Sequence, residues 1–227
     1  MYGKPMQPVG DRPIIQHLID RLRKIKQLDA IVLAISDGPG QGVFIDYAKK
    51  NGLEYIVGSE KDVLGRLIQA GDHVGADIVL RNTTENPYLY WENVDDMIRS
   101  HIERSADLTV TQKLPLGSFL EIISLDALKK SHRHGEDRHR SEFCTMFIAE
   151  NPQLFQVQSI LPPEKLQRPD IRLTVDTPQD LRLVRAIWEA LHKEGELISL
   201  EAIVDFLNAN PELAKMNQGQ DTLHLWR

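Results

Sequence analysis

Two apolar stretches of the sequence end in polar side chains that could bind a metal ion and a phosphate. One is IVLRNTTENP, which places Glu85 a few residues beyond its apolar run, and the other is IRLTVDTPQD, which places Asp176 directly after its own. In open α/β sheets, ligands bind beyond the carboxyl ends of the strands, so side chains that follow two strands can converge. Mg²⁺ typically takes one or two carboxylates together with substrate oxygens. Glu85 and Asp176 are therefore the candidate metal ligands.

A helix cap is the alternative role for Asp176. An aspartate ahead of Thr-Pro commonly accepts a hydrogen bond at the start of a helix, and Pro178 suits the first turn of the helix that follows. Spacing by itself leaves both roles open.

The elements that must position these residues alternate between strands and helices. Short apolar runs predict strands at 30–36, 54–58, 76–83, 107–113, 154–161 and 171–177, and segment 119–131 predicts a strand that runs into a short helix. Amphipathic runs predict helices at 13–26, 42–52, 62–75, 91–105, 140–152 and 178–195. This order is typical of βαβ units in a mainly parallel sheet. Ser199 caps one more predicted helix, 199–211, so we expect a domain at 1–195 and a C-terminal helical extension with a tail at 196–227.

Composition excludes several classes of protein. The 227 residues carry 27 basic and 33 acidic side chains, a formal charge of -6, which disfavours a nucleic-acid partner. Cys144 is the single cysteine, so no intramolecular disulfide can form. No apolar run approaches the roughly 20 residues that span a bilayer. We expect a cytoplasmic protein with a small-molecule partner and no membrane contact.

Four segments resemble one enzyme family, in the family's order and from residue 3 to about residue 210. They are GKPMQPVGDRPIIQHLIDRL, GSEKDVLGRL, RLTVDTPQDL and the helix preceded by ENP. Together they resemble the cytidylyltransferases of the spore-coat polysaccharide biosynthesis F type, relatives of the CMP-acylneuraminate and CMP-ketodeoxyoctulosonate synthetases. The resemblance implies a three-layer αβα Rossmann-like nucleotidyltransferase fold with a mainly parallel, mixed sheet.

The resemblance also implies an activity. Such enzymes transfer CMP, or another nucleoside monophosphate, from the triphosphate to an acidic sugar or sugar phosphate and release pyrophosphate. They serve surface glycan synthesis, use Mg²⁺ and are commonly homodimers. Catalysis must position an anionic or hydroxyl nucleophile against an anionic phosphorus, so it depends on orientation and on cancelling charge.

Residues are carried over from the family's motifs one by one. Lys4 matches a phosphate-contacting lysine, Asp176 matches the metal-binding aspartate, and Glu85 stands where the family has a second aspartate. The candidate nucleotide-binding residues are Lys4, then Gly58, Ser59, Asp62 and Arg66 of the GSEKDVLGR segment, and Arg81, Asn82 and Thr83, which are chosen for their place at a predicted strand end. The implied substrate-side residues are Glu121 and Glu142. For Arg66 a solvated helix arginine is an equal alternative, and both glutamates could be surface residues.

The sequence also departs from the family. A glutamate at 85 is one methylene longer than aspartate, Tyr90 replaces a later aspartate, and Phe143 replaces a histidine, which suggests a different acceptor. The family opens with a strand of about five or six residues and a phosphate-binding loop, and the present sequence starts inside the motif that follows them. We expect either a truncated chain, whose upstream reading frame encodes them, or a version without the loop. A non-catalytic homologue that acts as a binding or assembly partner is therefore the alternative function.

Two further segments have open or minor roles. HRHGEDRHR (132–140) could bind a metal or form a solvated loop, and the preferred hypothesis is a basic patch in which Arg138 or Arg140 binds the acceptor's phosphate or carboxylate. DGPGQG (37–42) has GxGxG spacing, which does not match a dinucleotide fingerprint and predicts a surface loop. The apolar C-terminal helices are expected to pack on the core or on a second subunit.

Overall fold

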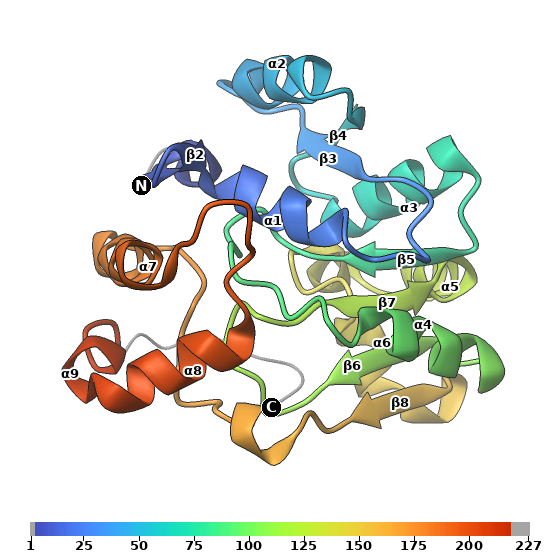
Figure 1. The fold of residues 1–227 in the computed structure, drawn as a ribbon. Coiled ribbons are helices and arrows are strands. Elements are labelled where there is room, and N and C mark those ends of the chain that lie inside the picture. The colour runs from blue at the N-terminus through green and yellow to red at the C-terminus, as the bar shows by residue number, and fades with distance from the viewer. Residues whose placement is uncertain (1–2, 219–227) are drawn as a thin grey trace.

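Six strands in two groups form the centre of the fold in the computed structural model, which describes residues 3–218 (Figure 1). β3 (Val32–Ser36) pairs in parallel with β4 (Glu54–Gly58). The other group has the order β5-β7-β6-β8, in which β7 is antiparallel to both neighbours and β6 is parallel to β8. Its strands are β5 (Ile78–Arg81), β6 (Leu108–Thr111), β7 (Glu121–Ser124) and β8 (Val157–Ile160). The expected mixed α/β sheet is confirmed, and β7 is the strand that makes it mixed.

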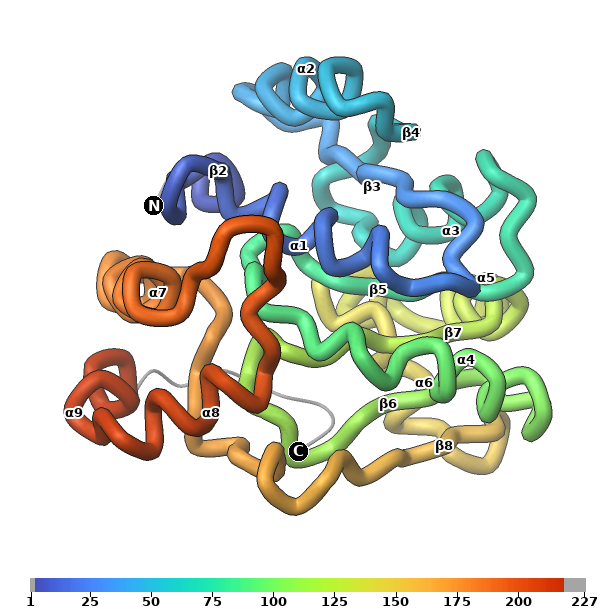
Figure 2. The backbone as a smooth tube through the Cα atoms, viewed as in Figure 1, coloured from blue at the N-terminus to red at the C-terminus, as the bar shows by residue number. Residues whose placement is uncertain are grey.

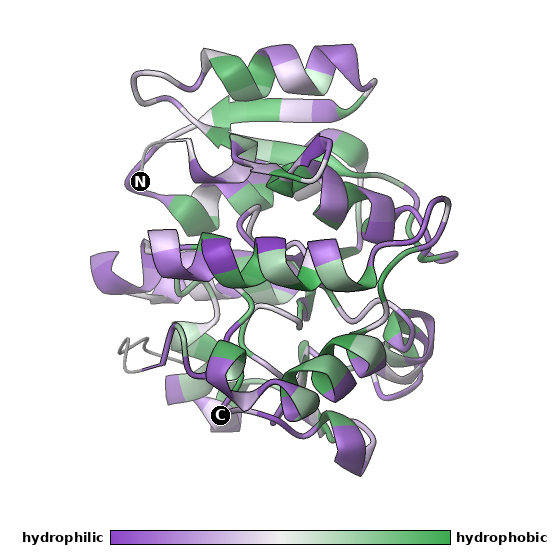
Figure 3. Cartoon of the chain, turned by 60° about the vertical axis from the view of Figure 1, so that its left-hand side comes forward, coloured by the Kyte–Doolittle hydropathy of each residue, from purple (hydrophilic) through white to green (hydrophobic). Residues whose placement is uncertain are grey.

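Helices cover both faces of the strands because successive strand residues point to opposite sides. Ile123 packs in a cluster with α3 (Val63–Val74), α5 (Leu125–His134) and α6 (Met146–Glu150). Its neighbour Ile122 packs in a second cluster with α1 (Ile14–Leu22) and α4 (Val94–Glu103). A third cluster joins α2 (Gly42–Lys50) to β3. Figure 3 shows both hydrophilic and hydrophobic residues along these helices, as an amphipathic element requires.

The predicted strand at 171–177 is wrong as a strand. This segment is extended, but a single bridge, Leu116 to Arg172, is its only ladder contact within residues 3–218. The reason is that its backbone amides form hydrogen bonds with two different loops and not with one strand. Leu173 N donates to Leu116 O (2.7 Å), and Val175 N donates to Glu85 O (3.0 Å). The alternating apolar residues that suggested a strand are buried against the C-terminal helices instead.

The C-terminal helices pack on the core, one of the two expected arrangements. α7 (Pro178–Leu191), α8 (Leu200–Ala209) and α9 (Pro211–Ala214) share one cluster with Ile171, Leu173 and Val175. Figure 2 traces the loop from α7 to α8 past α1, where Arg21 donates to Ile198 O (2.9 Å). The boundary at 195 stays a prediction, and residues 219–227 of the predicted tail lie outside the described residues.

Short elements connect these parts. They are η1 (Lys4–Met6), the hairpin of β1 (Pro8–Val9) and β2 (Arg12–Pro13), η2 (Asp137–Arg140), η3 (Pro152–Leu154) and η4 (Glu164–Leu166). No helix within residues 3–218 is long and apolar enough to cross a lipid bilayer.

A groove separates the two groups of strands. Between residues 3 and 218, β3 has only β4 as a ladder partner and β5 has only β7, so each strand has an open edge. A groove of about 450 Å³ is lined by residues of both strands, from Ile31 to Ala34 and from Ile78 to Arg81. Apolar side chains of α1 and α3 line it as well. The groove thus has strands on two sides and helices on two sides.

Candidate active site

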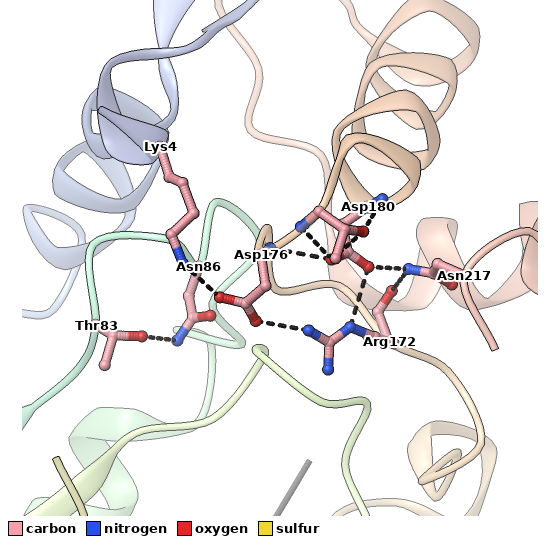
Figure 4. Close-up of polar contacts among 8 residues, drawn as sticks. Lys4, Thr83, Asn86, Arg172, Asp176, Asp180 and Asn217 are labelled. Carbon is pink, nitrogen blue, oxygen red and sulfur yellow. Dashed lines mark hydrogen bonds and ion pairs between the residues drawn. The ribbon is translucent and has the colours of Figure 1, made fainter. Parts of the chain in front are cut away.

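Asp176 is held between two cations at the end of the extended segment (Figure 4). Lys4 Nζ donates to Asp176 Oδ1 at 2.8 Å, and an Arg172 amino nitrogen donates to Oδ2 at 2.6 Å. Arg172 is 7% exposed, whereas Asp176 and Lys4 are 39% and 29% exposed. The ion pair between Lys4 and Asp176 joins positions 172 residues apart in the chain. A ligand can therefore reach Asp176 and Lys4, while the buried Arg172 holds the second oxygen of Asp176.

The helix cap is a different residue. Thr177 is the N-cap of α7, and its hydroxyl accepts a hydrogen bond from Asp180 N, while Asp180 returns a capping-box contact. The Asp176 carboxylate is thus free of the capping role that the sequence left open, and its oxygens face Lys4 and Arg172 instead.

Asp180 anchors this arrangement from the interior. It is fully buried and accepts from Arg172 Nε (3.0 Å), Asp176 N (3.0 Å) and Thr177 N (2.8 Å). Asn217, in the turn after α9, donates to Asp180 Oδ1 (2.7 Å) and to Arg172 O (3.1 Å). Arg172, Asp180 and Asn217 were not predicted as site residues. The spacing of Arg172, Asp176 and Asp180, four residues apart, was a signal in the sequence, but no local pattern indicated Asn217.

Glu85 comes to the same place because Val175 N donates to its carbonyl oxygen (3.0 Å). Burial raises the pKa of Glu85, and the nearby Asp176 carboxylate adds to this effect while Lys4 opposes it. Burial by itself lowers the pKa of Lys4, but the hydrogen bond to Asp176, with Glu85 and Glu142 nearby, raises it overall. Lys4 is therefore a stable cation among three carboxylates.

The carboxylates of Glu85 and Asp176 fit a divalent cation only if a bound ligand supplies further oxygens to it. Two carboxylates, Glu85 and Asp176, converge here, and no group of three or more possible metal-ligating side chains exists among the described residues. That pattern matches Mg²⁺, which is commonly held by one or two carboxylates and completed by phosphate oxygens and water. Segment 132–140 likewise contributes to no such group among the described residues, so its metal-binding alternative has no support there.

A pocket of about 420 Å³ opens beside Lys4 and Glu85. It is lined also by Thr84 and Arg66, and by Gly40 and Gln41 of the DGPGQG segment. That segment was predicted only as a surface loop, and its closely spaced glycines were the one signal in the sequence that could have indicated a place in the site. The pocket shares Arg66, Thr84 and Glu85 with the groove between β3 and β5.

The GSEKDVLGR segment forms the wall that carries Arg66. Asp62 is the N-cap of α3 and accepts from Gly65 N (2.7 Å) and from a ring nitrogen of His132 (2.7 Å). Ser59 Oγ accepts from Asp62 N (3.2 Å), and Arg66 donates to Ser59 O (2.7 Å). Gly58, the last residue of β4, packs against two side chains of α3: a Cβ there would lie 2.7 Å from the Gln69 side-chain oxygen and 3.0 Å from Arg66 Cγ. Arg66 lines the pocket, and its contact with the base or sugar stays a prediction.

Asn82 and Thr83 lie at the end of β5 and orient a residue that sequence analysis did not single out. Asn86 Nδ2 donates to Asn82 Oδ1 and to Thr83 Oγ1, both at 2.9 Å (Figure 4 shows the Thr83 contact). Asn82 in turn donates to Phe119 O (3.0 Å). Asn82 and Thr83 line the groove together with Glu85.

Arg81 and Glu121 form an ion pair in which Glu121 is buried and Arg81 is partly buried. Arg81 donates to a Glu121 carboxylate oxygen (3.1 Å) and to Glu142 O (2.7 Å), and Thr145 donates to the other Glu121 oxygen (2.6 Å). Glu121 is 5% exposed, so it is not the surface glutamate of the alternative. Glu142 lines the groove.

Arg138 and Arg140 are held by carboxylates of their own region. Arg138 binds Glu150 with two hydrogen bonds (2.6 and 2.7 Å) and also contacts Glu136 (3.0 Å), and Arg140 pairs with Asp137 (3.4 Å). Neither arginine lines the pocket beside Lys4. Binding an acceptor anion there would have to compete with Glu150.

The fold is shared with solved nucleotidyltransferases. A cytidylyltransferase of Leptospira borgpetersenii superposes with a TM-score of 0.86 at 21% identity, covering 98% of this chain and 92% of that one. A CMP:2-keto-3-deoxy-manno-octonic acid synthetase in complex with CTP superposes with a TM-score of 0.63 at 14% identity, covering 84% and 93%.

Sequence comparison identifies the family. The chain belongs to the cytidylyltransferase family, which it matches over residues 1–219. The spore coat polysaccharide biosynthesis protein SpsF of Bacillus subtilis is 30% identical over 220 residues, covering 93% of this chain and 90% of the relative. A Methanocaldococcus jannaschii protein described as uncharacterised is 34% identical over 217 residues, covering 95% and 88%. The resemblance inferred from the four segments is confirmed.

Proposed function

We propose that this chain is a nucleotidyltransferase that transfers CMP from CTP to an acidic sugar or sugar phosphate for surface polysaccharide synthesis. The observation that carries the proposal is the cluster of Lys4, Glu85 and Asp176 beside a pocket at the end of the sheet, where α/β folds bind ligands. In the reaction, an oxygen of the acceptor forms a bond to the α-phosphorus of CTP. The bond from that phosphorus to the bridging oxygen breaks, and pyrophosphate leaves.

Each residue of the cluster then has a defined task. Lys4, which stays charged, binds the phosphate oxygens once it leaves Asp176. Glu85 and Asp176 hold the divalent cation, which supplies further positive charge to the phosphates when bound. The SpsF relative, by its name, acts in polysaccharide biosynthesis, and the synthetase neighbour was solved with CTP. Both support this choice of nucleotide and product class.

We further propose that the groove between β3 and β5 receives one more strand from the N-terminal side of the same polypeptide. The open edges of both strands and the apolar walls support this, because an inserted strand could pair on both sides. Gly3 and Lys4 line the pocket that adjoins one end of the groove, so a strand in the groove could continue into residue 3 through a phosphate-binding loop. The alternative, a non-catalytic homologue that binds or assembles with partners, stays open.

Calorimetric titration with CTP and Mg²⁺ tests the proposal. We expect weak CTP binding for the 227-residue chain and much tighter binding for a chain extended by the upstream reading frame. A screen of nucleotides and acceptors for pyrophosphate release would then identify the substrates. No CTP binding by the extended chain would favour the non-catalytic alternative.

Comparing Lys4→Met with Lys49→Met separates a specific role of Lys4 at the phosphate from the general effect of removing a positive charge. Loss of a preorganised cation at the transferring phosphate lowers kcat/KM by about 10²- to 10³-fold. Lys49→Met, on the exposed side of α2, removes the same charge outside the pocket and should leave kcat/KM unchanged. Equal effects of the two variants would contradict the role of Lys4. The resemblance also implies a homodimer, which light scattering after size exclusion would test.

A further inference from the structure

We propose that Arg172 is a positioning residue for Asp176 and that Asn217 makes the C-terminal extension part of the active site. This inference rests on the metal-binding role proposed above for Asp176. It concerns three residues that do not line the pocket: Arg172, Asp180 and Asn217 (Figure 4).

Arg172 controls which oxygen of Asp176 is available. Its amino nitrogen binds Oδ2 at 2.6 Å, so the other oxygen, Oδ1, faces Lys4 at 2.8 Å. A carboxylate on a half-exposed loop would otherwise rotate about its side-chain torsions. With Oδ2 held, Oδ1 is the oxygen that a cation meets when Lys4 moves to the phosphate.

Asp180 in turn fixes the guanidinium of Arg172. The Nε atom of Arg172 donates to Asp180 Oδ1 (3.0 Å), and the remaining oxygen of Asp180 accepts from backbone and side chain of Thr177 (2.8 and 2.9 Å). Asp180 has no exposed surface, so Arg172 cannot turn away without leaving a buried charge unpaired. The planar fork of an arginine is needed here, because two different carboxylates are bound by one side chain.

Asn217 extends the network to the C-terminal helices. Its side chain is 2% exposed and donates both to Asp180 Oδ1 (2.7 Å) and to the carbonyl oxygen of Arg172 (3.1 Å). The helices α8 and α9, which pack on the core, deliver this amide to the segment that carries Asp176. Partners that orient a metal ligand typically change metal affinity or activity by 10- to 100-fold when removed.

Binding of Mn²⁺, followed by the electron paramagnetic resonance of the free ion, tests the proposal without requiring turnover. Manganese is used because it reports its own binding and has oxygen-ligand preferences close to those of Mg²⁺. We expect Arg172→Met to weaken Mn²⁺ binding 10- to 100-fold and Asn217→Ala to weaken it several-fold. Arg172→Lys, which keeps the charge but not the fork, should recover part of the loss.

Asn210→Ala is the matched control. Asn210 lies in the same extension, and its amide donates to Phe206 O (2.8 Å), with no contact to Asp180. It should lower thermal stability as Asn217→Ala does, without changing Mn²⁺ affinity. If Arg172→Met fails to fold, the Mn²⁺ affinities of Asn217→Ala and Asn210→Ala are compared instead. Weaker binding by Asn217→Ala alone supports the positioning network, and equal affinities refute it.

Asp176→Asn separates the two levels of inference. If it abolishes Mn²⁺ binding while Arg172→Lys and Asn217→Ala bind normally, the positioning network is refuted and the metal site stands. If Asp176→Asn itself binds Mn²⁺ normally, both the metal site and the network are overturned.

Discussion

Replacement of Asp180 by asparagine is expected to destabilise the protein strongly, although the two side chains have nearly the same volume. One Asp180 oxygen accepts from Arg172 and Asn217, and the other accepts from Asp176 N and from Thr177. An asparagine can offer an oxygen to only one of these sets, and its NH₂ group then faces donors on the other side. The charge of buried Arg172 also loses its fully buried partner.

The magnitude follows from the burial of the pair. Breaking a buried ion pair by removing one partner costs about 3–5 kcal/mol. For a chain of this length, each kcal/mol lowers Tm by about 2–4 °C, so Asp180→Asn should lower Tm by roughly 6–20 °C. Asp205→Asn is the control, because Asp205 is 55% exposed and pairs with Lys165 on the surface. It should change the free energy of unfolding by no more than about 0.5 kcal/mol.

The pH dependence gives a second test by calorimetry or circular dichroism. Burial by itself raises the pKa of Asp180, but hydrogen bonds from Arg172, Asn217 and the backbone outweigh it and lower the pKa overall. A lowered pKa in the folded state means that the stabilisation is present above the unfolded pKa, about 3.9, and is lost as the pH falls through the folded pKa. The difference in Tm between wild type and Asp180→Asn should therefore be constant from about pH 7 to pH 5 and shrink below that. A difference under about 1 kcal/mol at pH 7 would refute the reasoning.

Three further predictions concern other parts of the site. Glu85→Gln should raise Tm at pH 7 while weakening Mn²⁺ binding, because the raised pKa of Glu85 means that its ionised carboxylate costs stability. The gain in Tm should vanish below the pKa of the unfolded state. A lower Tm of the variant at pH 7 would contradict this prediction. Gly117→Ala should lower the free energy of unfolding by at least about 2 kcal/mol, because φ is +85° and a Cβ would lie 2.5 Å from the backbone nitrogen of Thr174. Gly52→Ala is the control, at φ +62° in open space, and should lower it by only about 1–2 kcal/mol. Equal losses in the two variants would count against the close contact at Gly117. Replacing Arg138 and Arg140 by alanine should raise KM for the acceptor more than KM for CTP if the basic patch binds the acceptor, and an unchanged acceptor KM would remove that role.

Local sequence determined most of the elements. Strand 54–58 follows from its short apolar run, and the cap Ser199 forms its hydrogen bond with Ala202 N, three residues further on, so both could be predicted from the sequence. The resemblance of four segments also brought Lys4 and Asp176 to one site, and the structure puts them 2.8 Å apart.

Only the tertiary structure decided what each site residue contacts. Segment 171–175 has the alternation of a strand, yet its hydrogen bonds go to loops that contain Leu116 and Glu85, because those loops lie where a strand partner would have been. Asn217 follows a short terminal helix in a polar stretch, and its position beside Asp180 depends on how α8 and α9 pack on the core. Such contacts join residues tens to hundreds of positions apart, and no local propensity encodes them. Asp176 was thus identifiable from sequence as a site residue, whereas the network that orients it was not.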